Sequence, residues 1–206
     1  MQDELGESSV RQRLMEAAIR LFTNRGYAAT SVREIVEMAG VTKPALYYHF
    51  ESKEGIYLAI LDDLVKVAEH VIAASRAVEG TARERIQGFL THTFEHFEKR
   101  RAEVRMINSV FWGPAQGVPP FDFDTFHGMF QGFVREVVVE GIATGELRAA
   151  DPEAVTLTIV GVLSFNMDLD IAHPELGLGQ DGLRRMLDLV FEGLAARPAG
   201  QQESDR

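Results

Sequence analysis

Hydrophobic residues recur every three or four positions through most of the chain, which is the spacing of an amphipathic helix. Between Val10 and Phe22 the apolar positions follow this spacing, and Gly26 stands where a glycine that ends a helix is expected. Similar segments fill the rest of the sequence, separated by stretches rich in Gly and Pro such as residues 113–120. No useful length of sequence alternates with the period of two that a β-strand requires. The pattern predicts an all-α protein.

One segment, residues 134–142, is rich in β-branched residues and could be taken for a strand. The helical spacing is nevertheless kept before and within it, by Phe126, Phe130, Phe133 and Val137. We therefore expect this segment to be helical.

The second predicted helix covers residues 31–39. Ser31 and Glu34 form the S-x-x-E pattern of a capping box at its start, and Gly40 follows its last turn. A tight turn at Gly40 and Val41 then leads directly into another short helix.

This third helix, from about Lys43 to His49, is too short to be stable alone. Thr42 can cap it, and Pro44 lies in its first turn, where a missing N–H costs nothing. Leu46 and Phe50 are four residues apart and are expected to pack inward. The remaining side then exposes aromatic and basic side chains. Ser52 can cap a long fourth helix that runs to about residue 77.

Two short helices joined by a tight turn and preceded by an amphipathic helix have the layout of a helix-turn-helix, whose second helix enters the major groove of DNA. Lys43 could donate to guanine or to phosphate, and the ring of Tyr48 could lie on a thymine methyl group. Tyr47, His49 and Lys53 could reach phosphate oxygens. The alternative is that three short helices simply pack together without binding DNA.

The charge distribution favours DNA binding at this end of the chain. The whole sequence has 21 Lys and Arg against 31 Asp and Glu, a formal net charge of −10. Residues 8–55 contain seven basic and five acidic residues, so this segment carries +2 while the rest carries −12. Any nucleic-acid site must therefore be local.

Composition excludes several other classes. The chain has no cysteine, which rules out disulfides, thiolate zinc sites and cysteine nucleophiles. The first residues, MQDELGESS, lack the apolar core of a signal peptide, and no run of about eighteen apolar residues occurs. We expect a cytoplasmic protein without a membrane segment.

Residues 17–61 resemble the N-terminal domain of the TetR family of transcriptional regulators almost position for position. The most specific matches are LF and GY before the capped helix, AGV at the turn, LYYHF in the third helix and SKE after it. The resemblance implies a helix-turn-helix domain at residues 8–55 and a helical ligand-binding and dimerisation domain at 56–197. We expect residues 1–7 and the polar residues 198–206 to be flexible tails.

The same resemblance implies which residues touch DNA. They lie at the start of the second helix, along the third and just beyond it: Ser31, Arg33, Thr42, Lys43, Pro44, Tyr47, Tyr48, His49 and Lys53. Many relatives have glycine at the position of Pro44. Proline offers no N–H but can contact a thymine methyl group, which puts a main-chain base contact there in doubt.

Aromatic residues concentrate in the middle of the chain, around the Gly- and Pro-rich loop at residues 113–124. The simplest interpretation is a packed core, but so rich a cluster also suits a cavity for an apolar or aromatic small molecule. The candidate ligand-binding residues are Phe89, His92, Phe97, Phe111, Trp112, Phe126, Phe130 and Phe165.

His92 and His96 are four residues apart, a spacing that puts two imidazoles on one face of a helix. A metal site is the less favoured interpretation because no further ligand can be placed. We expect no metal and no cofactor.

The last two predicted helices, Pro152–Ala172 and Leu178–Ala196, carry wide apolar faces that could belong to the intramolecular core. In the TetR family, such helices pair with those of a second subunit. The resemblance thus implies a homodimer that reads two half-sites of a palindromic operator.

The sequence as a whole predicts a ligand-responsive repressor, released from a double-stranded DNA operator when a small hydrophobic effector binds. An enzyme is disfavoured because the chain has no Walker loop, dinucleotide-binding glycine pattern, G-x-S-x-G or H-E-x-x-H. A TetR-like protein with an architectural role and no effector is the remaining alternative.

Overall fold

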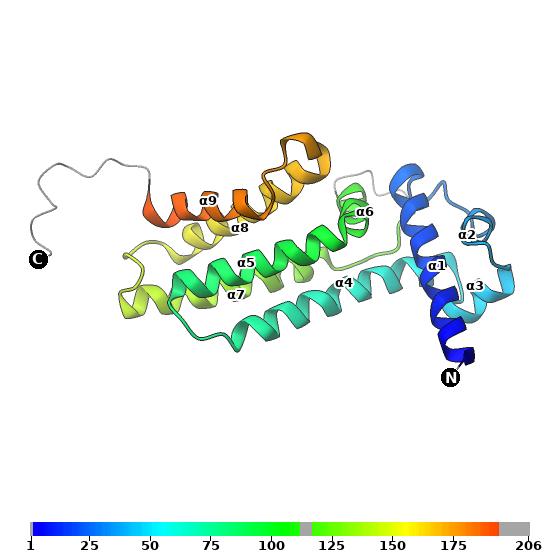
Figure 1. Ribbon diagram of the computed structural model, residues 1–206, viewed down its shortest axis with the longest axis horizontal. Coiled ribbons are helices and arrows are strands. Elements are labelled where there is room, and N and C mark those ends of the chain that lie inside the picture. Colours follow the sequence, from blue (N-terminus) through cyan, green and yellow to red (C-terminus); the bar gives the residue numbers. More distant parts are fainter. Residues whose placement is uncertain (1, 112–116, 194–206) are drawn as a thin grey trace, which may run out of the picture. The chain divides into compact units, whose positions relative to one another are not determined.

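The computed structural model describes residues 2–111 and 117–193, with side chains in these ranges except at 2–8, 110 and 111. All regular structure in this part of the chain is helical, without a strand, which confirms the predicted fold class (Figure 1). The helices are α1 (Gln2–Arg25), α2 (Val32–Ala39), α3 (Lys43–Phe50), α4 (Lys53–Arg76), α5 (Ala82–Lys99), α6 (Arg101–Phe111), α7 (Phe123–Thr144), α8 (Pro152–Ala172), the 3-10 turn η1 (Pro174–Leu176) and α9 (Gly179–Glu192).

The chain forms two compact units. The first comprises Met1–Ala77 and Glu95–Phe130, and the second comprises Val78–Phe94 and Gln131–Arg206. The first unit therefore contains the three N-terminal helices together with α4 and α6, and the second contains α8 and α9. A separate domain at residues 8–55 stays a prediction.

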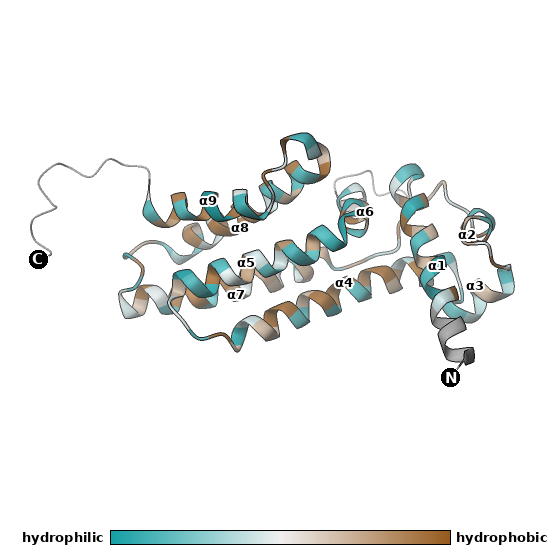
Figure 2. Cartoon of the chain, viewed as in Figure 1, coloured by the Kyte–Doolittle hydropathy of each residue, from teal (hydrophilic) through white to brown (hydrophobic). Residues whose placement is uncertain are grey.

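In the first unit, α1 is the central helix, because it packs against α2, α3, α4 and α6. The apolar stripe predicted for α1 is buried, with Leu14 and Ala18 fully enclosed and Phe22 almost so. Hydrophobic residues also run along α4, which contributes Ile56, Ile60 and other residues to the buried surface (Figure 2). Such burial is what holds helices as short as α2 and α3 in place.

In the second unit, α8 packs against α9. Leu163 of α8 and Leu183 and Leu187 of α9 are buried. Phe89 in α5 and Phe133 in α7 are both buried, and their ring centroids lie 4.4 Å apart. Arg83 of α5 reaches Asp188 of α9 at 2.7 Å. The β-branched segment at 134–142 belongs to α7, as its helical spacing predicted.

Three predicted boundaries differ from the structure or lie outside it. Residues 2–7, expected to be a flexible tail, continue α1 toward the N-terminus. Helix α9 ends at Glu192 because Gly193 has a φ of 77°, so the predicted helix to Ala196 stops earlier. The predicted tail at 198–206 lies outside the described residues.

Within the described ranges, α8 alone is long and apolar enough to cross a membrane, judged by length and composition. Only 28% of its most apolar 18-residue window is buried. A helix that packs against another protein subunit can have the same composition, and α8 also carries the buried polar residues Asn166 and Asp170.

Candidate nucleic-acid interface

The capping box predicted at the start of α2 is present. The Ser31 hydroxyl accepts a hydrogen bond from the backbone N–H of Glu34 at 3.3 Å, and the Glu34 carboxylate accepts one from the backbone N–H of Ser31 at 2.8 Å. The hydroxyl also donates to the same carboxylate at 2.8 Å. Two backbone donors that the helix cannot satisfy internally are thus paired, so an eight-residue helix begins at a defined position.

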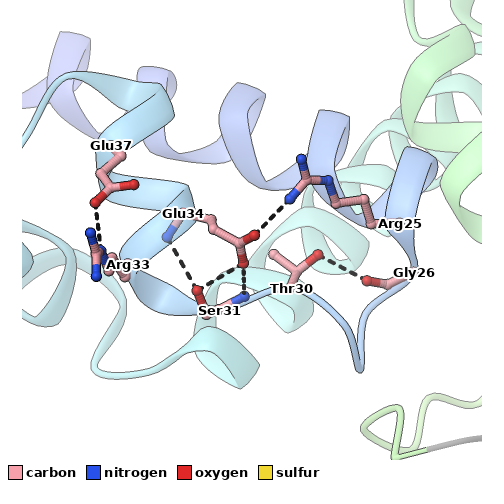
Figure 3. A network of polar contacts seen from close by, with 7 residues as sticks. All are labelled: Arg25, Gly26, Thr30, Ser31, Arg33, Glu34 and Glu37. Atoms are coloured by element: carbon pink, nitrogen blue, oxygen red, sulfur yellow. Dashed lines mark hydrogen bonds and ion pairs between the residues drawn. The ribbon is translucent and has the colours of Figure 1, made fainter.

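The same carboxylate connects α2 to the end of α1, as Figure 3 shows. The Arg25 guanidinium lies 2.6 Å from Glu34. The Ser31 hydrogen bonds, from the backbone first and the hydroxyl second, and then Arg25 lower the pKa of Glu34. In the loop itself, the buried Thr30 hydroxyl donates to the Gly26 carbonyl at 2.9 Å. The loop between α1 and α2 is therefore held at both ends.

The turn between α2 and α3 depends on a left-handed residue. Gly40 has φ 63° and ψ 39°, and its N–H donates to the Glu37 carbonyl at 3.3 Å. The N–H of Val41 donates to the Val36 carbonyl at 3.0 Å. Glycine adopts this backbone conformation without strain, which is why the chain can turn directly into α3. Since α2 packs against α3 and both pack against α1, these helices form the predicted helix-turn-helix.

Helix α3 has two faces of opposite character. Leu46 is fully buried and Phe50 is 6% exposed, as predicted. Tyr47 is 50% exposed and Tyr48 is 72% exposed, and Lys43 and Pro44 are exposed with them. Burying two tyrosine rings would stabilise a protein that functioned alone, so their exposure indicates a surface that meets a partner.

Two other predicted DNA contacts, Thr42 and Arg33, lie at the start of α3 and on α2. Thr42 precedes α3 in an extended conformation, but its hydroxyl does not cap the helix as predicted. Arg33 donates to Glu37 one turn along α2 at 2.7 Å, and both side chains are mostly exposed. An exposed ion pair of this kind contributes little to stability, so the guanidinium can exchange Glu37 for a phosphate.

The surroundings of Lys53 differ from those expected for a phosphate contact. Its ammonium donates to the carbonyls of Tyr27 and Thr30, both at 2.9 Å, and lies 4.1 Å from the centre of the Tyr27 ring. Burial lowers the pKa of Lys53. The side chain thus turns toward the loop between α1 and α2, because two converging carbonyls and an aromatic face there hold a cation.

The connection between α3 and α4 is compact. Glu51 has a φ of 63° and a ψ of −32°, and among the described residues it is the one non-glycine with a positive φ. Ser52 caps α4 by accepting from the N–H of Gly55 at 2.9 Å. A side chain at Gly55 would collide with the Phe50 carbonyl oxygen, which approaches the Gly55 backbone closely. The first turn of α4 is therefore pressed against the end of α3.

The candidate ligand-binding residues divide between the two units. Phe97, Phe126 and Phe130 belong to the first unit, and Phe89, His92 and Phe165 belong to the second. Phe97 and Phe89 are buried, while Phe126 and Phe130 are half-buried with their rings 5.5 Å apart. Trp112 and the side chain of Phe111 lie outside the described residues.

Phe165 requires a correction as a candidate for an enclosed pocket. Its side chain is 62% exposed on α8, so it does not line a closed cavity of the single chain. It was a candidate because aromatic residues concentrate in the middle of the chain, but the face of α8 that carries it is uncovered.

His92 and His96, the pair considered for a metal site, lie on α5. Among the described residues, no group of three or more His, Cys, Asp or Glu side chains is arranged to hold a metal ion.

Sequence reasoning missed the residues that join the helix-turn-helix to α4. Gly55 gave no signal because glycine in a helix interior normally only lowers helix stability. Glu51 gave none because a positive φ at glutamate cannot be read from a sequence. The ion pair between Arg25 and Glu34 could have been found, since a basic residue ends α1 and an acidic one opens α2.

Comparison with known proteins agrees with this geometry. The family described as "Bacterial regulatory proteins, tetR family" matches residues 14–60. The HTH-type transcriptional repressor KstR2 of Mycolicibacterium smegmatis is 30% identical over 145 residues, which cover 68% of this chain and 69% of that protein.

Two solved structures share the fold. The TetR family regulator PfmR from Thermus thermophilus is 24% identical with a TM-score of 0.73, over 89% of this chain and 100% of that one. FadR from Bacillus subtilis, solved in complex with stearoyl-CoA, is 16% identical with a TM-score of 0.68, over 89% of this chain and 99% of that one.

The family match spans the end of α1, the capped α2, the turn and α3, which together form the helix-turn-helix seen in the structure. The relative with two-thirds coverage extends the similarity well beyond this motif. The chain therefore belongs to the TetR family of DNA-binding transcription regulators.

Proposed function

We propose that this protein is a cytoplasmic homodimeric repressor that binds a palindromic operator and releases it when a small apolar or aromatic effector binds. The observation that carries the proposal is the two-faced α3, whose apolar side is buried while two tyrosines and Lys43 are exposed. A short helix held by its buried face can present the other face to the major groove.

Within this proposal, the exposed side of α3 divides into two roles. Lys43, Pro44 and Tyr48 read base edges, through a charged donor to guanine and apolar contacts to thymine methyl groups. The remaining candidates position the protein on phosphates from the helix starts and from α3: Ser31, Arg33, Thr42, Tyr47 and His49. The Ser31 hydroxyl has one proton, which it donates to Glu34 in the structure. To bind a phosphate oxygen it would turn that proton from Glu34 to the phosphate while still accepting from the Glu34 N–H.

The homodimer would form through α8 and α9. Leu157 and Phe165 are exposed on α8, and Leu189 is exposed on α9. Large apolar side chains gathered on adjacent helices favour a protein partner over water. A second copy is the partner that a helix-turn-helix protein needs, since two half-sites about one turn of DNA apart must be read together.

The effector would bind in the helical region after residue 55, where we place the ligand-binding and dimerisation domain at 56–197. The candidate contacts there are mainly aromatic, which suits an apolar ligand. The FadR structure that shares this fold contains stearoyl-CoA, a molecule with a long apolar chain. Acyl thioesters are therefore the first effector class to test.

The experiment begins with operator selection from random duplex DNA by the purified protein. Fluorescence polarisation then measures the affinity for the selected duplex and for a scrambled one, across a range of salt concentrations. We expect sequence-dependent binding that weakens steeply with salt. Equal affinity for both duplexes would contradict the proposal.

Two further measurements test regulation. Transcription from a promoter that contains the selected duplex should fall when the protein is added, and an increase would contradict repression. Titration with acyl thioesters of different chain length should release the duplex. A protein that binds the duplex but neither represses transcription nor responds to acyl thioesters would have the architectural role instead of the proposed one.

A further inference from the structure

Ser31 is exposed at the start of α2, where its hydroxyl is bound to Glu34. The hydroxyl proton is donated to Oε2 of Glu34 at 2.8 Å, and the Ser31 backbone N–H donates to the same oxygen, also at 2.8 Å. Arg25 lies 2.6 Å from the other carboxylate oxygen, Oε1 (Figure 3). The carboxylate therefore keeps a partner on each oxygen when the hydroxyl turns away from it.

The hydroxyl proton is also what an operator phosphate would take from Ser31. A serine hydroxyl has one O–H donor and two acceptor lone pairs. The N–H of Glu34 uses one of these lone pairs, at 3.3 Å, and this bond can stay in place whichever way the proton points. The phosphate contact proposed for Ser31 needs the proton itself, so two anions compete for it.

The Glu34 carboxylate is a strong competitor for this proton. A hydrogen bond to an ionised acceptor is roughly twice as strong as one to a neutral acceptor. Hydrogen bonds from the Ser31 backbone and then from its hydroxyl lower the pKa of Glu34, so the carboxyl is ionised at neutral pH. Breaking the hydroxyl bond to Glu34 is thus one of the steps that oppose phosphate binding.

We propose that Glu34 is a positioning residue that limits operator affinity, because its carboxylate withholds the Ser31 proton from the DNA phosphate. The inference rests on the operator binding proposed above. It adds a second effect to the capping of α2, since one hydrogen bond both stabilises the start of the helix and opposes DNA binding. A substitution that weakens this bond and keeps the cap should therefore raise operator affinity.

Glu34→Gln is such a substitution. Glutamine also serves at the third position of a capping box, so its side-chain oxygen can still accept from the Ser31 N–H. An uncharged amide oxygen holds the hydroxyl proton less strongly. By fluorescence polarisation we expect the affinity for the selected operator to rise about 3- to 10-fold, the difference between a charged and a neutral acceptor. A purely structural role of Glu34 would instead lower affinity together with stability.

A double-mutant cycle with Ser31→Ala tests whether the hydroxyl causes this gain. Without the hydroxyl there is no proton to release, so Glu34→Gln should no longer raise operator affinity. All four proteins are compared at one salt concentration and below their unfolding midpoints, because Ser31→Ala also removes the cap of α2. Equal gains with and without the hydroxyl would overturn the proposal, since the cause would then be the loss of a negative charge near DNA. An affinity of Glu34→Gln equal to or below that of wild type would overturn it as well.

The matched control is Glu37→Gln, which removes a carboxylate one position after the next turn of α2 begins. Glu37 pairs with Arg33 at 2.7 Å and forms the same type of exposed charge on the same helix. Any change in affinity that this variant causes should be the same with and without the Ser31 hydroxyl. A change that depended on Ser31 to the same extent as that of Glu34→Gln would contradict the inference.

Modified DNA gives a test that identifies the phosphate. Operator duplexes in which a methylphosphonate replaces one phosphate each lack a negative charge at a known position. We expect the affinity gain of Glu34→Gln to disappear at one position in each half-site and to remain at the others. A gain that survived every replacement would show that Ser31 gives its proton to no phosphate, and the inference would be wrong.

The outcomes distinguish this inference from the proposed function. If wild-type protein selects no operator, the proposed function fails and the competition for the proton fails with it. If wild type binds an operator but Glu34→Gln gives no gain that depends on Ser31, operator binding stands and the role assigned to Glu34 is wrong.

Discussion

Among the residues of α3, Tyr48 exposes the largest share of a large hydrophobic side chain, at 72%, and its ring meets that of His49 edge to face at 5.0 Å. An exposed tyrosine ring on a short helix gains none of the stability that burial in a core would give. At the scale of single residues, this exposure is the strongest local indication of a binding surface.

Tyr48→Ala tests the base-reading role proposed for this ring. We expect specific operator affinity to fall by about 1–3 kcal/mol, as for a lost base contact, while the thermal midpoint changes little because the ring is exposed. Fluorescence polarisation and thermal unfolding measure the two quantities. Retained operator affinity would count against the base-reading role of Tyr48. The control variant is Met38→Ala, which removes another exposed side chain, on α2.

Glu51 is a residue whose conformation is unfavourable for its type. A positive φ at a non-glycine residue costs on the order of 1–3 kcal/mol, and here it lies at the point where α3 gives way to α4. The strain is tolerated because the helices on both sides are fixed by buried residues such as Phe50 and Ile56.

Glu51→Gly should therefore raise the free energy of unfolding by about 1 kcal/mol, because glycine adopts this backbone conformation without strain. Glu51→Ala is the matched control and should leave stability nearly unchanged, since alanine has the same backbone restriction. Chemical denaturation measures both. If the glycine variant were less stable than the alanine variant, the positive φ would not be the cause.

At the scale of helices, several starts rely on a carboxylate that pairs backbone donors. Glu34 does so at α2, Glu84 at the start of α5 through Thr81, and Asp122 at the start of α7 through Thr125. Hydrogen bonds to these charged groups lower the pKa of each carboxyl. Each carboxylate therefore contributes stability only while it is ionised.

The sign of the pH dependence follows from these lowered pKa values. Above the ordinary pKa of 4.5 for Glu34, its capping contribution is complete, and it is lost as pH falls through the lower pKa of the folded state. We expect wild type to be more stable than Glu34→Gln near neutral pH, and this difference in stability should narrow as the pH falls below 4.5. Thermal unfolding of both proteins across this range tests it, and a constant gap would contradict the capping role.

At the scale of the whole molecule, the uncovered face of α8 is the feature that a single chain does not explain. A helix with a mean hydropathy of 1.5 over its most apolar window leaves most of that window unburied. Such a surface is unfavourable in water, so we expect a second copy of the chain to cover it.

Phe165→Glu should disrupt the proposed dimer, because a carboxylate buried without a partner costs about 3–5 kcal/mol. We expect a monomer by sedimentation and weaker operator binding, since two half-sites are then no longer read together. Val78→Glu, another exposed apolar position outside α8 and α9, is the matched control and should remain dimeric. A dimeric Phe165→Glu protein would place the interface elsewhere.

The sequence by itself determined the all-α fold, the helix-turn-helix and the two faces of α3. These follow from local rules: a helical period, a capping box at Ser31 and Glu34, a glycine at the turn, and apolar residues spaced four apart. The tertiary structure alone decided where Lys53 points, how Glu51 and Gly55 join α3 to α4, and that Phe165 lies on an uncovered face. The position of Lys53 depends on two loop carbonyls more than twenty residues away, and spacing in the sequence carries no record of that convergence. The joint at Glu51 and Gly55 is local, but it depends on a backbone angle that the residue types do not reveal.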